Sequence, residues 1–146
     1  MARAAAQGAQ AAGDISVNLS SACETGADEV LAADGFLFVT PENLASMSGM
    51  MKDFFDRTYY AALDRINGRP YAILVCAGSD GSNAVRQIQR IATGWRLREV
   101  AAPIIVNTTA QTPPAILAIK TIAPDQLRLC HDRGALLAAG LAAAVW

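Results

Sequence analysis

Two consecutive stretches, Phe36-Leu37-Phe38-Val39-Thr40-Pro41-Glu42-Asn43 and Leu44-Ala45-Ser46-Met47-Ser48-Gly49-Met50-Met51-Lys52-Asp53-Phe54-Phe55-Asp56, decide the fold of this chain. The apolar run 36–39 predicts a buried strand, the polar stretch 40–49 predicts a loop, and the pattern after it predicts a helix. An open α/β sheet builds a ligand crevice from this order of elements, at the edge where its strands end. We therefore expect residues 40–49 to lie at such an edge.

The same order of elements recurs further along the chain. The continuous apolar run Tyr71–Ala77 predicts a strand covered on both faces, and it ends in Gly78-Ser79-Asp80-Gly81-Ser82. A helix is predicted over 83–93 and another strand over 103–106. Strands that alternate with helices are typical of a parallel sheet. The fold class expected is therefore α/β.

The remaining segments complete this alternation. Residues 1–12 predict a helix that ends near Gly13, and the alternation of Ile15, Val17 and Leu19 with polar residues predicts a strand. A helical turn is predicted over 28–33 and a helix over 50–66. A long connection, 107–124, contains one possible helical turn at 115–118 and leads to a closing helix from Asp125, whose Ala-rich end would suit a subunit interface.

Composition limits the classes of function. The chain has 146 residues, which is room for one domain, 1–146, and its mean hydropathy is +0.26. No apolar run reaches the roughly 18 residues of a membrane span, and no secretory signal is visible. The net charge of −1 argues against a nucleic-acid partner. Three widely spaced cysteines, Cys23, Cys76 and Cys130, show no metal-binding spacing and suit free thiols in a reducing cytoplasm.

The residues from Thr40 to Arg57 carry a family resemblance. Thr40-Pro41-Glu42-Asn43, the Ser46-Met47-Ser48-Gly49 stretch and Met51-Lys52-Asp53-Phe54-Phe55-Asp56-Arg57 together resemble the isoalloxazine-facing loop of flavodoxin-like NAD(P)H-dependent FMN reductases. From Ile15 onward the layout is similar to the doubly wound flavodoxin-like fold, whose strand order is 2-1-3-4-5. The resemblance implies FMN as cofactor, and NADPH or NADH as co-substrate.

This sequence departs from the family at its beginning. In the family a first strand and a loop that holds the flavin phosphate precede the first helix, whereas Met1 falls where that helix is already under way. A central strand of about five residues is therefore expected to be absent. Two explanations stay open: the protein starts upstream of Met1, or the chain compensates by pairing its other strands directly or by borrowing from a partner chain. Either way we expect weakened flavin binding.

The resemblance assigns candidate residues to two loops that should meet at one sheet edge. The first loop contributes Thr40, Pro41, Glu42 and Asn43 along the flavin ring, with Ser48 and Gly49 at the next helix start. The second loop, on the other side of the ring, contributes Ala77, Gly78, Ser79, Asp80 and Gly81. Ordinary strand-to-helix connections, with Ser48 as a helix cap, would explain the same residues. Residues 107–114 could cover the crevice or form a surface excursion.

No arrangement of catalytic side chains is visible, and none is needed if a flavin supplies the chemistry. The only histidine, His131, lies in the predicted closing helix and suits a surface or packing role. The resemblance implies hydride transfer from a nicotinamide to FMN and on to a quinone or similar small acceptor, in a homodimer or homotetramer. A flavodoxin-type electron carrier is the alternative, although both loops lack the aromatic side chains that such carriers use; a flavin-free remnant is the third possibility.

Overall fold

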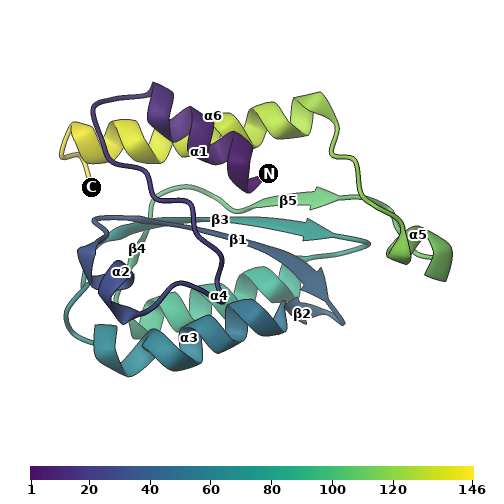
Figure 1. Ribbon diagram of the computed structural model, residues 1–146, viewed down its shortest axis with the longest axis horizontal. Coiled ribbons are helices and arrows are strands. Elements are labelled where there is room, and N and C mark those ends of the chain that lie inside the picture. Colours follow the sequence, from purple (N-terminus) through teal and green to yellow (C-terminus); the bar gives the residue numbers. More distant parts are fainter.

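A sheet lies between two layers of helices in the computed structural model, which describes residues 1–146 (Figure 1). The helices are α1 (Ala2–Ala11), α2 (Ala27–Ala32), α3 (Gly49–Ala62), α4 (Ser82–Gly94), α5 (Pro113–Leu117) and α6 (Pro124–Ala142). The strands are β1 (Phe36–Asn43), β2 (Ser46–Met47), β3 (Pro70–Ala77), β4 (Arg98–Glu99) and β5 (Ile104–Asn107). The predicted alternation of strands and helices is confirmed.

The centre of the sheet is parallel, as the alternation predicted. β1 pairs with β3 from Phe36 opposite Tyr71 to Pro41 opposite Cys76. The other edge of β3 pairs with β4 at its start and with β5 from Leu74 to Ala77. Parallel strands all end at the same edge of a sheet. The connections that follow β1, β3 and β5 therefore begin next to one another.

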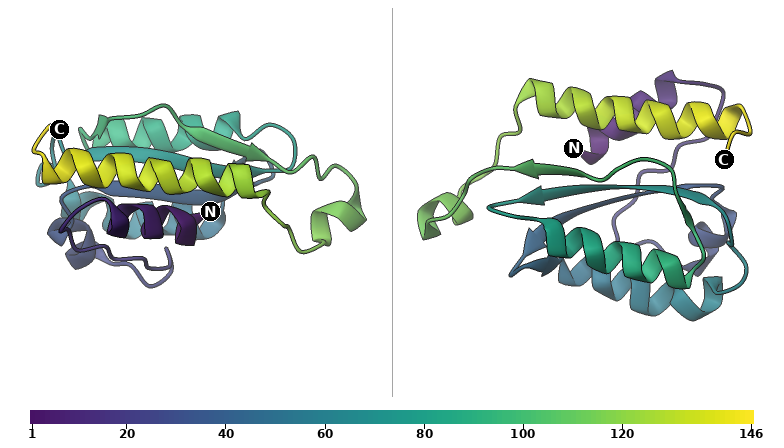
Figure 2. Two further views of the ribbon diagram at one scale, coloured as in Figure 1. Left: turned by 90° about the horizontal axis from the view of Figure 1, so that it is seen from above. Right: turned by 180° about the vertical axis from the view of Figure 1, so that it is seen from behind.

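Helices cover both faces of this sheet. α1 and α6 lie together on one face, and α3 and α4 lie on the other (Figures 1 and 2). β3 is buried nearly throughout, which explains its uninterrupted apolar sequence. Below the sheet, Phe55, Trp95 and Ile88 are at most 1% exposed; burying each such side chain contributes about 1.5–3 kcal/mol. This core fixes the ends of β1 and β3 relative to α3 and α4.

α1 and α6 approach each other through glycines. A Cβ atom on Gly8 would lie 1.9 Å from the carbonyl oxygen of His131, and one on Gly134 would lie 1.9 Å from the carbonyl oxygen of Ala5. Only a residue without a Cβ allows these backbones to come so close. The pair therefore forms one tightly packed layer above the sheet.

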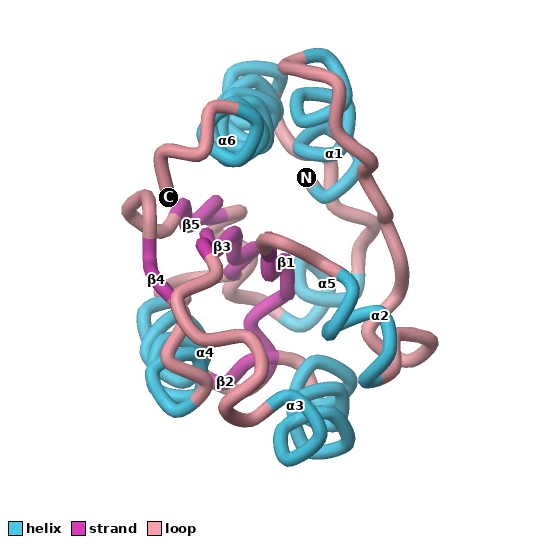
Figure 3. Tube along the Cα trace, turned by 90° about the vertical axis from the view of Figure 1, so that its left-hand side faces the viewer, coloured by secondary structure: helices cyan, strands magenta, loops and turns pink.

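The prediction of a strand over Ile15–Ser20 is wrong. The alternating pattern is present, but the segment forms no strand and none of the backbone groups of residues 16–20 takes part in a hydrogen bond within the protein. A strand exists only where a neighbour pairs with it, and this segment has none. Figure 3, which views the molecule from one side, shows it as a loop outside the three central strands.

β1 is longer than predicted, and the loop after it is a hairpin. The strand continues to Asn43, a two-residue turn follows at Leu44 and Ala45 with φ of 51° and 59°, and β2 returns antiparallel. Two consecutive residues of positive φ make the tight turn that suits adjacent antiparallel strands. This turn could not be predicted from the sequence, because neither residue is Gly, Asn or Asp.

Candidate functional site

Three connections converge where β1, β3 and β5 end. The carboxylate of Glu42 accepts a hydrogen bond from the Gly81 N–H at 2.9 Å, which ties the first connection, 40–49, to the second, 77–82. The Thr108 N–H donates to the Ala77 carbonyl at 2.8 Å, which ties the third connection, 107–114, to the second. The structure thus brings together the two loops that the sequence assigned to one edge.

Within the first connection, two buried candidate residues form hydrogen bonds inside the protein instead of facing the edge. Thr40 and Ser48 are 2% and 5% exposed. The Ser48 N–H donates to the Thr40 hydroxyl at 3.1 Å, and the Ser48 hydroxyl caps α3 by accepting from the Met51 N–H at 3.2 Å. These hydroxyls hold the hairpin against α3. Pro41 and Asn43 are exposed, and a Cβ on Gly49 would meet no atom within 4 Å, so these three face open space.

The second connection also contains residues that pack inside the protein and residues that are exposed at the edge. Ala77 is buried, and a Cβ on Gly78 would lie 2.7 Å from the Ala110 carbonyl oxygen, so Gly78 is needed for the close approach of the third connection. Gly81 has a φ of +81° at the start of α4, a conformation that glycine adopts without strain. Ser79 and Asp80 are exposed at the tip, and the Ser82 hydroxyl donates to the Asp80 carboxylate.

The third connection belongs partly to the site and partly to the surface. The Asn107 side-chain amide donates to the Ser79 carbonyl, the Thr108 hydroxyl donates to the Ala77 carbonyl at 3.0 Å, and Ala110 is buried. α5 then projects away from the sheet and both helical layers (Figure 2). Residues 107–110 therefore pack on the sheet edge, whereas α5 does not cover it.

Sequence reasoning missed the role of α4 in shaping this edge. The Gln87 side-chain oxygen accepts hydrogen bonds from the Ser46 hydroxyl at 2.8 Å and from the Met47 N–H at 3.0 Å. One turn earlier, the Asn83 amide donates to the Ala45 carbonyl at 2.6 Å. Two amide side chains spaced by four residues share a helix face, which is the only signal that could have indicated this contact.

The other reactive groups lie in packing or surface positions. Burial raises the pKa of the Cys76 thiol above its usual value, which favours the thiol over the reactive thiolate. The His131 Nδ1 lies 3.2 Å from the exposed carboxylate of Asp132 on α6. No group of three or more His, Cys, Asp or Glu side chains is arranged to hold a metal ion.

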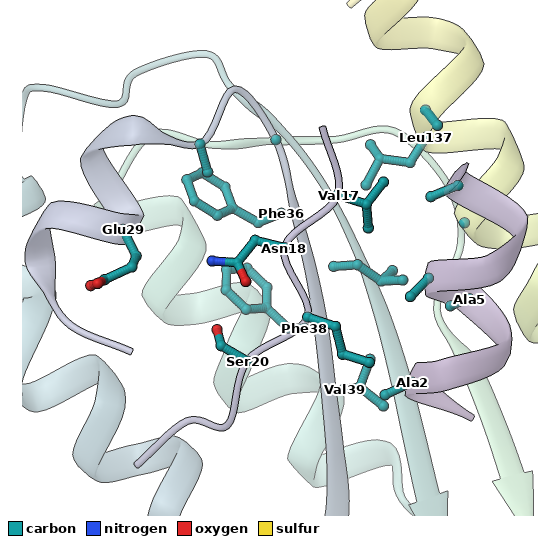
Figure 4. A pocket seen from close by; sticks show the side chains of 18 of the residues that line it. Ala2, Ala5, Val17, Asn18, Ser20, Glu29, Phe36, Phe38, Val39 and Leu137 are labelled. Carbon is teal, nitrogen blue, oxygen red and sulfur yellow. The ribbon is translucent and has the colours of Figure 1, made fainter. Parts of the chain in front are cut away.

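One cavity lies beside β1, away from these connections, and another is lined by Ser46 and Met47 of the first connection. A cavity of about 870 Å³ lies between β1, α1, α6 and the segment 14–20 (Figure 4); we call it the β1-edge cavity. A second cavity of about 420 Å³ lies between α3 and α4, with Lys52, Arg86 and Arg90 among its lining residues. Neither is lined by residues 77–82.

A parallel sheet covered on both faces by helices, with its connections gathered at the carboxyl edge, is the layout of a doubly wound α/β protein, and solved flavodoxins share this fold. Residues 3–111 match the family described as NADPH-dependent FMN reductase, and the chain belongs to that family. The same residues include the first two connections and the start of the third. None of the curated proteins matches the sequence.

Solved structures show the same fold at low sequence identity. A flavodoxin from the domain Archaea is 16% identical, with a TM-score of 0.74 over 96% of this chain and 87% of that one. An NADPH-quinone reductase from P. pentosaceus is 14% identical, with a TM-score of 0.58 over 94% of this chain and 88% of that one. The flavodiiron core from Synechocystis is 18% identical, with a TM-score of 0.74; 97% of this chain matches it but spans only 32% of its length.

None of the helices combines the length and the apolar character that crossing a bilayer requires.

Proposed function

We propose that this protein is an FMN-dependent oxidoreductase that uses NADPH or NADH to reduce a quinone or a similar small acceptor. The match of residues 3–111 to the FMN reductase family is the observation that carries the proposal. FMN bound here would supply the redox chemistry, taking a hydride from the nicotinamide and passing electrons to the acceptor. The protein's own residues would bind the flavin and the nicotinamide and orient one against the other.

In the connections at this edge, some candidate residues would contact the flavin ring and others would hold those residues in position. Pro41, Asn43, Ser79 and Asp80 are exposed at the edge and would contact the ring, and Gly49 leaves room beside them. Other candidates would position these contacts through the bonds already described: Thr40, Glu42, Ser48, Ala77, Gly78 and Gly81. The residues at this edge therefore suit the ring of FMN. Their backbone is already held in place by hydrogen bonds before the flavin binds.

The chemistry of the edge favours hydride exchange over simple electron carriage. Neither 40–49 nor 77–82 contains Phe, Tyr or Trp, so no aromatic side chain from these connections would cover the ring face. A nicotinamide needs that face to stack against the flavin. The structural likeness to an archaeal flavodoxin supports the electron carrier as the second candidate.

Adding FMN and then NADPH to the pure protein under anaerobic conditions separates the candidates. Rapid bleaching of the flavin's visible absorbance, with turnover once a quinone is added, supports the reductase. Protein-bound FMN that neither NADPH nor NADH reduces supports the carrier and contradicts the reductase. Failure to retain FMN at any workable concentration contradicts both.

Asp80→Ala tests the ring contact in the same assay. Asp80 is exposed and its carboxylate is bonded only to Ser82, so the substitution should change the free energy of unfolding by less than about 0.5 kcal/mol. We expect altered FMN affinity or turnover at an unchanged Tm. Glu24→Gln, an exposed carboxylate outside all three connections, is the matched control. A large loss of thermal stability in Asp80→Ala would make its role structural instead.

We also propose that the protein forms a homodimer or homotetramer. The segment around α5 carries three large apolar side chains that are 58%, 85% and 98% exposed: Ile116, Leu117 and Ile119. Exposed apolar groups gathered on a projecting segment are typical of an interface. Light scattering should give a multiple of the 15.3 kDa chain mass, and Leu117→Lys should reduce it; a monomer in both would contradict the proposal.

A further inference from the structure

The cavity of about 420 Å³ between α3 and α4 collects cationic side chains from both helices; we call it the α3–α4 cavity. Lys52 comes from α3, and Arg86 and Arg90 come from α4. β2 contributes Ser46 and Met47, and Figure 3 shows this strand between the two helices. Only two of the eight lining residues are hydrophobic, so the cavity suits a polar ligand.

The two arginines of the α3–α4 cavity have no acidic partner. Neither Arg86 nor Arg90 takes part in an ion pair, and they lie four residues apart on one helix, where like charges repel each other. Lys52 donates to both carboxylate oxygens of Asp56, at 2.6 and 2.8 Å, which leaves the third N–H of its ammonium for another acceptor. The cavity therefore holds two uncompensated positive charges, and an anion bound between the arginines would offset their repulsion.

The amide side chains of this cavity hold its walls in place. Gln87 binds the Ser46 hydroxyl and the Met47 N–H, which fixes β2 against α4. The Asn83 side chain binds the Ala45 carbonyl through its nitrogen, and its oxygen accepts from a guanidinium nitrogen of Arg86 at 3.5 Å. The hairpin, α4 and one of the two arginines are thus linked before any ligand arrives, and such preorganisation lowers the cost of binding.

Phosphate is the anion whose shape and charge match this set of donors. A guanidinium presents its N–H donors in a planar fork that pairs with two phosphate oxygens, and an ammonium adds a point charge. A phosphate monoester carries about two negative charges near pH 7, which matches the two unpaired arginines, whereas a carboxylate carries one and would leave an arginine unpaired. The cavity volume of about 420 Å³ lies within the range of small-molecule sites, so a group attached to the phosphate has room.

We propose that the α3–α4 cavity binds a phosphate dianion, free or carried by a small molecule as a monoester, between Arg86 and Arg90 with Lys52 as a third donor. Because β2 belongs to the first connection, 40–49, the bound molecule lies next to the candidate site for FMN. The phosphate site does not depend on flavin. Two sources share its chemistry: inorganic phosphate, and a nucleotide with a 2′-phosphate such as NADPH, and only the second source rests on the proposed function.

Calorimetric titration of the flavin-free protein with two probes tests the proposal. The probes are inorganic phosphate and 2′-AMP, which carries the monoester that NADPH has and NADH lacks. Both are added in about 0.1 M NaCl, where charges more than roughly 10 Å apart are screened. Arg86→Gln and Arg90→Gln each remove one charge from the cavity. Arg128→Gln is the matched control, because Arg128 is an exposed arginine of α6 without an ion pair.

We expect saturable binding that Arg86→Gln and Arg90→Gln each weaken at least about tenfold and that Arg128→Gln leaves unchanged. Tm should stay the same in all three variants, because these side chains are exposed. If 2′-AMP binds at least about tenfold more tightly than phosphate, a nucleotide is the source; otherwise the source is free phosphate, and either result supports the site. No saturable binding of either probe, or equal weakening by Arg128→Gln, overturns the proposal. Neither result depends on whether the protein retains FMN.

Discussion

Gly78 shows how one residue decides the shape of the candidate site. Its Cβ, if present, would lie 2.7 Å from the Ala110 backbone oxygen, which cannot move without shifting the third connection. We expect Gly78→Val to lower Tm and to weaken FMN binding at least about tenfold, or 1.4 kcal/mol, because the edge is displaced. Thermal unfolding and an FMN titration measure both effects.

Gly49→Ala is the matched control for thermal stability, since a Cβ there meets no atom within 4 Å. It should leave Tm unchanged. Equal Tm values for Gly78→Val and Gly49→Ala would refute the close approach of Ala110, and unchanged FMN affinity in Gly78→Val would refute the placement of the flavin.

Tyr71 makes stability depend on pH. Burial, with a smaller contribution from the negative charge of Glu99, raises the pKa of this phenol from 10.0 to about 12. The folded state therefore favours the neutral phenol, so its contribution to stability is complete below pH 10 and is lost as the pH rises from 10 to 12. In Tyr71→Phe, the free energy of unfolding should therefore fall less steeply between pH 10 and pH 12. Urea unfolding measured at a series of pH values tests this.

Tyr60→Phe is the control, because Tyr60 is 84% exposed. It should retain the full alkaline loss of stability. If Tyr71→Phe loses stability between pH 10 and 12 in parallel with the unmodified chain, another group is responsible.

At the scale of residues, the sequence indicated where chemistry gathers but not what each side chain does. Pro41, Asn43, Ser79 and Asp80 are exposed at the expected edge. Ser48 takes the role of an ordinary helix cap, and Glu42 spans the two connections through the Gly81 N–H. That bond joins residues 39 positions apart in sequence, and no local pattern could have revealed it.

At the scale of elements, the contact between α1 and α6 offers the sharpest test. A Cβ on Gly134 would lie 1.9 Å from the Ala5 carbonyl oxygen, so Gly134→Ala must push the helices apart. Overpacking of this kind costs about 1–3 kcal/mol and should lower Tm by roughly 2–4 °C for each kcal/mol. Thermal unfolding followed by circular dichroism measures the change.

Gly13→Ala is the control at this contact. Its Cβ would meet only the Ala142 side chain, at an ordinary 3.5 Å, so its Tm should not fall. A Gly134→Ala variant as stable as Gly13→Ala would contradict the close helix approach.

The elements with strong local signals were predicted, and those that depend on neighbours were not. The helices and the strands β1, β3 and β5 follow from apolar periodicity, within a few residues at their ends. β2 and β4 have two residues each and carry no periodicity. Residues 15–20 have the pattern of a strand without the pairing, because a strand is defined by its neighbours as well as by its own sequence.

At the scale of the whole molecule, the order of the strands explains the position of the candidate site. β1, β3 and β5 end side by side, so connections from distant parts of the sequence form one surface. The alternation of elements predicted that these strands would end at one edge, and their parallel pairing confirms it. The β1-edge cavity could not be predicted in shape, because it depends on how α1, α6 and residues 14–20 settle around β1.

We propose that the connections 40–49 and 77–82 hold FMN, and an FMN titration followed by residue-resolved NMR would locate the bound flavin. We expect the largest amide shifts at Asn43, Gly49, Ser79 and Asp80, and a changed FMN affinity in Asp80→Ala. Shifts confined to residues 15–20 and the β1-edge cavity, or no shifts at all, would contradict this proposal.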